Sequence, residues 1–176
     1  VVKAASPTSI SEPSGSVQFS VSATNTSPFA SLTINSLMDD IYNDITTIGH
    51  DGITATTCTV PTAPVVLGAG ETYSCSFMAT VTGQGGDTET DTVTVSGVDE
   101  NNNEIEGEDS ATVTITDVQP SMTVSKTCSP CTRVEPGGSF TFTAVVNNTS
   151  PADAITLTSM VDDIYGDITQ IAGTTC

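Results

Sequence analysis

Three carboxylates lie within one short segment of the chain, and that segment occurs twice. Residues 39–44 read Asp-Asp-Ile-Tyr-Asn-Asp, and residues 162–167 read Asp-Asp-Ile-Tyr-Gly-Asp. Neither copy contains Lys or Arg, so its acidic side chains repel one another unless a cation or hydrogen-bond donors compensate their charge. Calcium binds several carboxylate and carbonyl oxygens in loose geometry. The segments therefore predict calcium sites whose ligands are Asp39, Asp40, Asp44, Asp162, Asp163 and Asp167.

A second interpretation of the two segments needs no metal. Asp side chains in turns accept hydrogen bonds from backbone N–H groups, and the variable position, Asn43 or Gly166, suits a turn with positive φ. The sequence leaves the calcium loop and the hydrogen-bonded turn open. Asp117 and Glu135 are secondary metal candidates, because they could meet the acidic loops at a junction between domains, where calcium would fix the angle between neighbours.

The duplication extends beyond the acidic segments. An offset of 123 residues, measured from Asp39 to Asp162, also superimposes four further pairs: Lys3 and Lys126, Glu12 and Glu135, Phe19 and Phe142, and Asn25 and Asn148. This period is several times longer than the roughly 20–50 residues of solenoid repeats, so it indicates tandem independent domains. We expect residues 1–120 to form a complete domain and residues 121–176 to form the N-terminal half of a second copy.

The predicted half domain is too small to bury a stable core by itself, since even complete domains of about 60 residues are marginal. Cys176 corresponds to Cys58, so the second copy lacks everything that follows this position in the first. We expect either a chain cut from a longer repetitive polypeptide or a subunit whose half domain is completed by a strand from its neighbour. The expected partners are copies of itself or neighbouring repeats along a fibre.

The composition restricts the classes of partner. The formal net charge is −18, with 3 basic residues against 21 acidic ones. A nucleic acid requires a basic footprint on its partner, so nucleic acid is not expected. No apolar run approaches the roughly 18 residues of a membrane span, and we expect no membrane contact in this segment. Surplus carboxylates suit divalent cations or a highly solvated extracellular surface.

The cysteines indicate an oxidising, extracellular compartment. Cys58 and Cys75 flank one loop of the first copy, and Cys128 and Cys131 together replace two other residue types of that copy. Each pair is predicted to form a disulfide, and the partner of Cys176 would lie beyond the chain. The competing interpretation of the Cys128–Cys131 pair is half a zinc site or a redox dithiol, but a second ligand pair and a thioredoxin-like βαβ context are missing.

Period-two alternation of apolar and polar residues predicts an all-β fold. It runs through residues 17–23, 72–81, 92–98 and 111–115, and Thr, Ser and Val dominate. Seven or more short strands in roughly 120 residues favour tandem immunoglobulin-like β-sandwich domains, although Trp is absent. The linker near residues 117–120 is short and contains Pro120, whose fixed φ makes it stiff.

The segment 17–27, followed by Leu32-Thr33-Ile34 and Asp39, resembles the prokaryotic cell-surface repeats called domain of unknown function eleven. In those repeats one strand ends in an Asn-x-Gly or Asn-x-Ser turn and a second ends near an Asp. The resemblance covers both copies. It implies a secreted or surface-attached, multi-domain stalk and no catalytic activity. The doubled Asp, the Tyr and the cysteine pair depart from the common pattern.

Asn25, Asn147 and Asn148 begin Asn-x-Ser/Thr sequons. Their position at a turn suits N-linked glycans, which must point into solvent. The alternative is an Asn side chain that is hydrogen-bonded within the turn. O-linked glycans on the abundant Thr and Ser are also open, but no motif selects particular positions.

We expect no enzyme. His50 is the only histidine, no nucleophile has a recognisable base, and an Asp39–Asp44 glycosidase pair would lack an aromatic sugar platform. No small-molecule substrate is evident. We expect a structural segment of an extracellular filament or cell-surface stalk, stapled by disulfides and rigidified by calcium. The alternative is the spacer of a bacterial adhesin that presents a distal ligand-binding tip.

Overall fold

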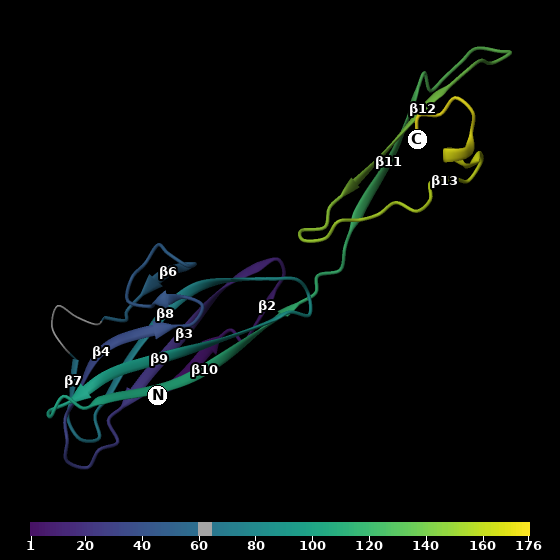
Figure 1. The fold of residues 1–176 in the computed structure, drawn as a ribbon. Helices are drawn as coiled ribbons and strands as arrows, with labels where there is room; N and C mark the ends of the chain where they lie inside the picture. Colours follow the sequence, from purple (N-terminus) through teal and green to yellow (C-terminus); the bar gives the residue numbers. More distant parts are fainter. Residues whose placement is uncertain (60–64) are drawn as a thin grey trace. The chain divides into compact units, whose positions relative to one another are not determined.

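The computed structural model describes residues 1–59 and 65–176, and the chain divides into two compact units. The first unit comprises Val1–Val118 and the second comprises Gln119–Cys176 (Figure 1). The sequence places the boundary two residues later, after Pro120.

The first unit is a sandwich of two β-sheets. One sheet has the strand order β1-β3-β8-β6, and the other has the order β2-β10-β9-β4-β5 with β7 also paired to β4. The first sheet contains β1 (Val2–Ser6), β3 (Ser14–Thr24), β8 (Thr72–Thr82) and β6 (Ile53–Thr56). The second contains β2 (Ser9–Ser11), β10 (Glu104–Thr116), β9 (Thr88–Asp99), β4 (Leu32–Asp39), β5 (Asn43–Asp44) and β7 (Val65–Leu67). The predicted all-β sandwich class is confirmed.

Alternation along the strands produces the core between the sheets. On β3, Val17, Phe19 and Val21 are buried, and the residues between them are exposed. Phe19 lies opposite Phe77 in the antiparallel β3–β8 register, and their ring centroids are 5.1 Å apart. Because side chains point to opposite faces at successive positions of a strand, the period-two pattern defines which face of each sheet is buried.

The N-terminal segment contributes one strand to each sheet. β1 pairs antiparallel with β3, whereas β2 pairs parallel with β10. Pro7 lies between the two strands, and it has no N–H group with which to continue a ladder. Within β1 the inward-facing, buried position is occupied by Lys3, so a charged side chain enters the core.

The second unit contains two separate hairpins. β11 (Met122–Ser129) pairs antiparallel with β12 (Thr141–Asn148), and β13 (Val161–Asp162) pairs with β14 (Gly166–Asp167) before a single 3₁₀ turn, η1 (Ile168–Gln170). Phe142 is 45% exposed although its counterpart Phe19 is fully buried. In the first unit β8 pairs with β3 and places Phe77 beside Phe19, and residues 119–176 contain no counterpart of β8. The second unit therefore leaves apolar side chains exposed that the first unit covers.

Residues 1–59 and 65–176 contain two disulfides. Cys58 is joined to Cys75 with a Cα–Cα distance of 4.8 Å, and Cys128 is joined to Cys131 with a Cα–Cα distance of 5.2 Å. Cys176 is free and exposed. Cys58 is buried in the core, and Cys75 lies on β8. The first disulfide thus ties the segment that follows β6 to the sheet.

Replacing both Cys58 and Cys75 by Ala is expected to lower the free energy of unfolding of the first unit by about 3 kcal/mol. The disulfide joins residues 17 positions apart, and it therefore restricts a loop of that length in the unfolded chain. Urea unfolding monitored by circular dichroism would measure the difference. Cys176→Ala is the matched control and should leave stability unchanged. Equal stabilities of the double variant and this control would contradict the prediction.

Candidate functional site

One carboxylate of the first acidic segment, Asp39, contacts a cation from a distant part of the chain. Nζ of Lys3 donates to Oδ2 of Asp39 at 2.5 Å and also donates to Oδ2 of Asp91. The side chains of Lys3 and of both aspartates are completely buried. We call these three residues the ion cluster. Lys3 therefore supplies to Asp39 the cation that residues 39–44 lack.

The two sheets position the ion cluster between them. Lys3 lies on β1 of the first sheet, whereas Asp39 ends β4 and Asp91 lies on β9 in the second. Aromatic rings enclose the ammonium group. Nζ of Lys3 lies 4.8 Å from the centroid of Phe19 and 5.6 Å from that of Phe77, distances that are favourable for a cation above a ring face.

Charge is unbalanced in the ion cluster, since one ammonium group faces two carboxyl groups. Oδ1 of Asp91 is buried and has no hydrogen-bond partner among the described residues. Burial raises the pKa of Asp91 to about 6, although Lys3 opposes the shift. Removal of a carboxylate from water disfavours its charged form, so burial shifts Asp91 toward protonation.

The remaining oxygen of Asp39 shapes the turn that follows β4. Its Oδ1 accepts hydrogen bonds from the backbone N–H groups of Ile41 and Tyr42, each at 3.0 Å. In the second unit Asp162 accepts from Ile164 and Tyr165 at 3.0 and 3.1 Å, and its other oxygen accepts from Lys126. The repeated Asp at this position thus has the same two roles in both copies.

Three more of the predicted metal ligands, Asp40, Asp44 and Asp167, accept protein hydrogen bonds. Oδ1 of Asp40 accepts from the N–H of Thr92 at 2.7 Å. Oδ1 of Asp44 accepts from N and Oγ1 of Thr46 at 2.9 and 2.6 Å, and Asp167 accepts from Thr169 at 3.0 and 2.7 Å in the same way. Asp163 is exposed.

The structure does not gather the acidic residues of the first segment around one point. In the described part of the chain, Asp39, Asp40 and Asp44 do not form a group of three carboxylates whose ligand atoms lie within 4.8 Å of one another. Their bonds correspond to the hydrogen-bonded turn that the sequence left open as the alternative. Calcium binding by these segments stays a prediction.

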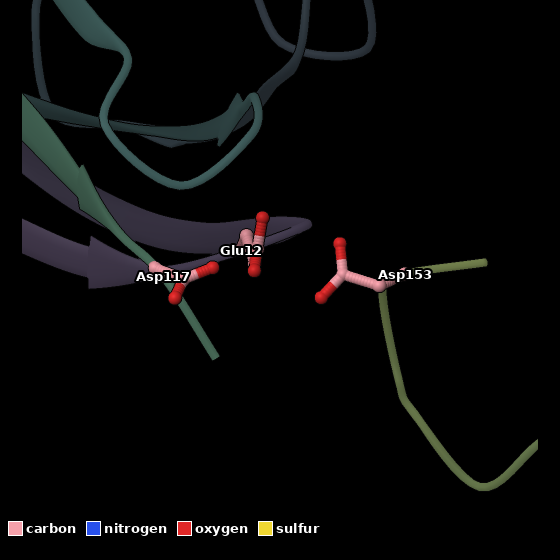
Figure 2. Close-up of side chains that lie close together, drawn as sticks. All are labelled: Glu12, Asp117 and Asp153. Carbon is pink, nitrogen blue, oxygen red and sulfur yellow. The ribbon is translucent and has the colours of Figure 1, made fainter. Parts of the chain in front are cut away.

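Glu12 and Asp117, by contrast, lie close together within the first unit (Figure 2). Glu12 is buried, and its two carboxylate oxygens accept from the N–H of Val118 at 2.8 Å and of Gly85 at 2.6 Å. These backbone bonds hold the pKa of Glu12 below its ordinary value. Glu12 thus fastens the end of the unit to the β8–β9 connection. Its counterpart Glu135 is exposed.

The sequon at Asn25 is folded into the protein. Nδ2 of Asn25 donates to the backbone carbonyls of Ala30, Leu67 and Gly68 at 2.8, 3.0 and 3.1 Å, and the residue is buried. A glycan would occupy this same nitrogen. The geometry at Asn25 therefore favours the hydrogen-bonded turn. Asn147 and Asn148 are exposed, and Nδ2 of Asn148 donates to the carbonyl of Asp153.

Three participants in the site could not be assigned from sequence. Tyr42 is buried in the core, where its ring packs against Phe19 and Phe77 and its hydroxyl donates to Glu89 at 2.5 Å. Lys3 and Asp91 complete the ion cluster. The recurrence of Lys3 as Lys126 was a usable signal, because the repeat preserves very few cations.

Comparison with known proteins gives little further information. No family model and no curated protein matches the chain. Among solved structures, the chain is similar to the major pilin subunit of Bacillus cereus, with 7% sequence identity and a TM-score of 0.35. The match covers 85% of this chain and 55% of the pilin, so the chain spans about half of that protein. No helix among residues 1–59 and 65–176 is long and apolar enough to cross a membrane.

Asn25→Ala is expected to lower the free energy of unfolding of the first unit by about 2–4 kcal/mol, because it leaves buried carbonyl groups without donors. Chemical denaturation would measure the change. Asn101→Ala, at an exposed Asn of the same unit, is the control and should have little effect. A small change at Asn25, similar to that of the control, would contradict the assigned turn.

Glu12→Gln is expected to lower the melting temperature near neutral pH, and the difference from wild type should shrink as the pH falls. The folded-state pKa of Glu12 is depressed, so its carboxylate stabilises the fold above the unfolded-state pKa and this contribution is lost on protonation. Thermal unfolding measured from about pH 7 to about pH 2.5 tests this. Glu135→Gln should show no such trend, and a pH-independent difference at Glu12 would refute the assignment.

Proposed function

We propose that the chain is a non-enzymatic structural segment of an extracellular filament or cell-surface stalk built from tandem β-sandwich repeats. The observation that carries the proposal is the internal use of the repeated polar residues. Asp39, Asp44 and Asn25 are engaged in hydrogen bonds within their own unit. The residues that recur in both copies are therefore used to stabilise the fold of a single unit. This use supports a protein whose role is to repeat that unit.

The architecture supports a load-bearing role. Strands of both sheets run along the length of the sandwich in the first unit (Figure 1), and a disulfide ties β8 to the segment after β6. A disulfide restricts the unfolded chain and persists in oxidising surroundings. Together these features support an extracellular location.

The charge supports a solvated and non-catalytic surface. The net charge is −18, and net charge far from zero keeps a protein soluble at high local density. His50, the residue best suited to proton transfer near neutral pH, pairs with the adjacent Asp51 at 2.8 Å in an exposed loop. This pair has no counterpart in the second copy.

Copies of the same chain, or neighbouring repeats, are the proposed partners. The second unit leaves apolar side chains such as Phe142, Val145 and Tyr165 exposed. Exposed apolar surface favours association with a complementary partner. A strand supplied by another repeat would pair with β12 as β8 pairs with β3 in the first unit.

Electron microscopy of the particle purified from its native source tests the proposal. A continuous fibre whose axial repeat matches the length of one sandwich unit is the expected result. Phe142→Asp should shorten or abolish the fibres, whereas Thr143→Asp, at the neighbouring position of β12, serves as the charge-matched control. Isolated stalks that end in a distinct terminal domain would instead favour the adhesin spacer, and monodisperse single chains would refute both.

A further inference from the structure

We infer that Lys3 and Asp91 condense to an intramolecular amide bond, with Asp39 carrying the protons. This modification goes beyond the proposed function and does not depend on it. The inference rests on the contacts of the ion cluster, its complete burial and the partnerless Oδ1 of Asp91.

The reacting groups are already in contact. Nζ of Lys3 touches Oδ2 of Asp91, so it lies beside the carboxyl carbon to which that oxygen is bonded. Both side chains project inward from strands of opposite sheets. Both are completely buried, so neither can move out into solvent. Groups that are held in this way react with effective molarities that reach about 10⁵ M or more.

The buried surroundings favour an amide bond over a cluster in which Lys3, Asp39 and Asp91 all stay charged. Three charges without solvent contact are costly, and a buried ion cluster is stabilising only when its remaining polar atoms are satisfied. Oδ1 of Asp91 is not satisfied among the described residues. Burial also raises the pKa of Asp91, which favours the neutral carboxylic acid, a better electrophile than the carboxylate.

Asp39 is placed to act as general acid and base, because its Oδ2 accepts from the same Nζ at 2.5 Å. It first removes one proton from the Lys3 ammonium group. The neutral amine then attacks Cγ of the protonated Asp91, and a C–N bond forms. Asp39 donates its proton to the departing hydroxyl group and takes a second proton from nitrogen, so that the C–O bond breaks and one water leaves.

The products balance in atoms and charge. The cluster begins with an ammonium, one carboxylate and one carboxylic acid, and it ends with a neutral amide, a protonated Asp39 and water. No oxidant or reductant is needed. The protonated Asp39 can donate to the amide oxygen, which gives the orphaned acceptor a partner. The aromatic rings of Phe19 and Phe77 beside Nζ keep out the water that would reverse the reaction.

The second unit supplies an internal control. Lys126 contacts Asp162, and its Nζ lies 4.8 Å from the centroid of Phe142, which reproduces the arrangement around Lys3 and Asp39. Position 91 belongs to β9, for which residues 119–176 have no counterpart. Within residues 119–176 Lys126 therefore contacts the proton acceptor but no counterpart of Asp91, so a polypeptide of these 176 residues should keep Lys126 unmodified.

Intact-mass spectrometry of the folded and then reduced 176-residue chain tests the proposal. The expected mass is one water less than the sequence requires, and tandem spectra of a protease digest should contain the Lys3 peptide joined to the Asp91 peptide. The full sequence mass, with separate Lys3 and Asp91 peptides, would overturn the inference.

Variants distinguish the water lost in forming the Lys3–Asp91 amide from water lost at another site. Asp39→Asn keeps both reacting groups but removes the base, and it should retain the full mass; Lys3→Met should do the same. Lys126→Met should still lose one water. If the loss persists in Lys3→Met, it comes from another site, such as a succinimide at Asp51-Gly52, and the inference fails. Circular dichroism of each variant establishes that it is folded, and the wild-type result alone is decisive where a variant does not fold.

Discussion

The burial of Lys3 between two aspartates is the constraint on which the rest of the first unit depends. Removal of three ionisable groups from water costs several kcal/mol per ion, so the ammonium must meet both carboxyl groups. A slip of β1 by one residue would turn Lys3 outward and leave Asp39 and Asp91 without a cation. The ion cluster therefore fixes the register of β1 against β3, and because its members come from both sheets, it also fixes how the sheets face each other.

The aromatic residues and the acidic turn follow from the same constraint. Asp39 contacts Lys3 with one oxygen and caps the turn with the other, which directs Tyr42 back into the core. The ring of Tyr42 then lies 5.6 Å from those of Phe19 and Phe77. Burial and the neighbouring Glu89 raise the pKa of Tyr42, so its hydroxyl remains a donor. One Asp thus links the ion cluster, the turn and the aromatic core.

Period and composition were sufficient to predict the strands, because the alternation at Val17, Phe19 and Val21 directly reports which face is buried. Comparison of the two copies was also sufficient to pair the cysteines, because Cys58 and Cys75 flank one loop and Cys128 and Cys131 occur together only in the second copy. The role of residues 39–44 was not accessible, since local sequence shows three carboxylates without a cation and gives no sign that Lys3 reaches them from another strand. Asn25 illustrates the same limit: its sequon is visible, but its three carbonyl partners are brought together only by the fold.

Comparison of the two copies distinguishes the bonds that the repeated segment forms in both units from the burial that only the complete sandwich provides. In both, Asp caps the turn and contacts the repeated Lys, so these bonds need only the local hairpins and the first strand. In the second unit the Lys126 side chain is 43% exposed, and its hydrogen bond lowers the pKa of Asp162 to about 2, as expected for a solvated pair. In the first unit β8 and β9 exclude water, and burial raises the pKa of Asp91 instead. Closure of the sandwich therefore converts an ordinary ion pair into a buried site where one lysine contacts two carboxyl groups without solvent.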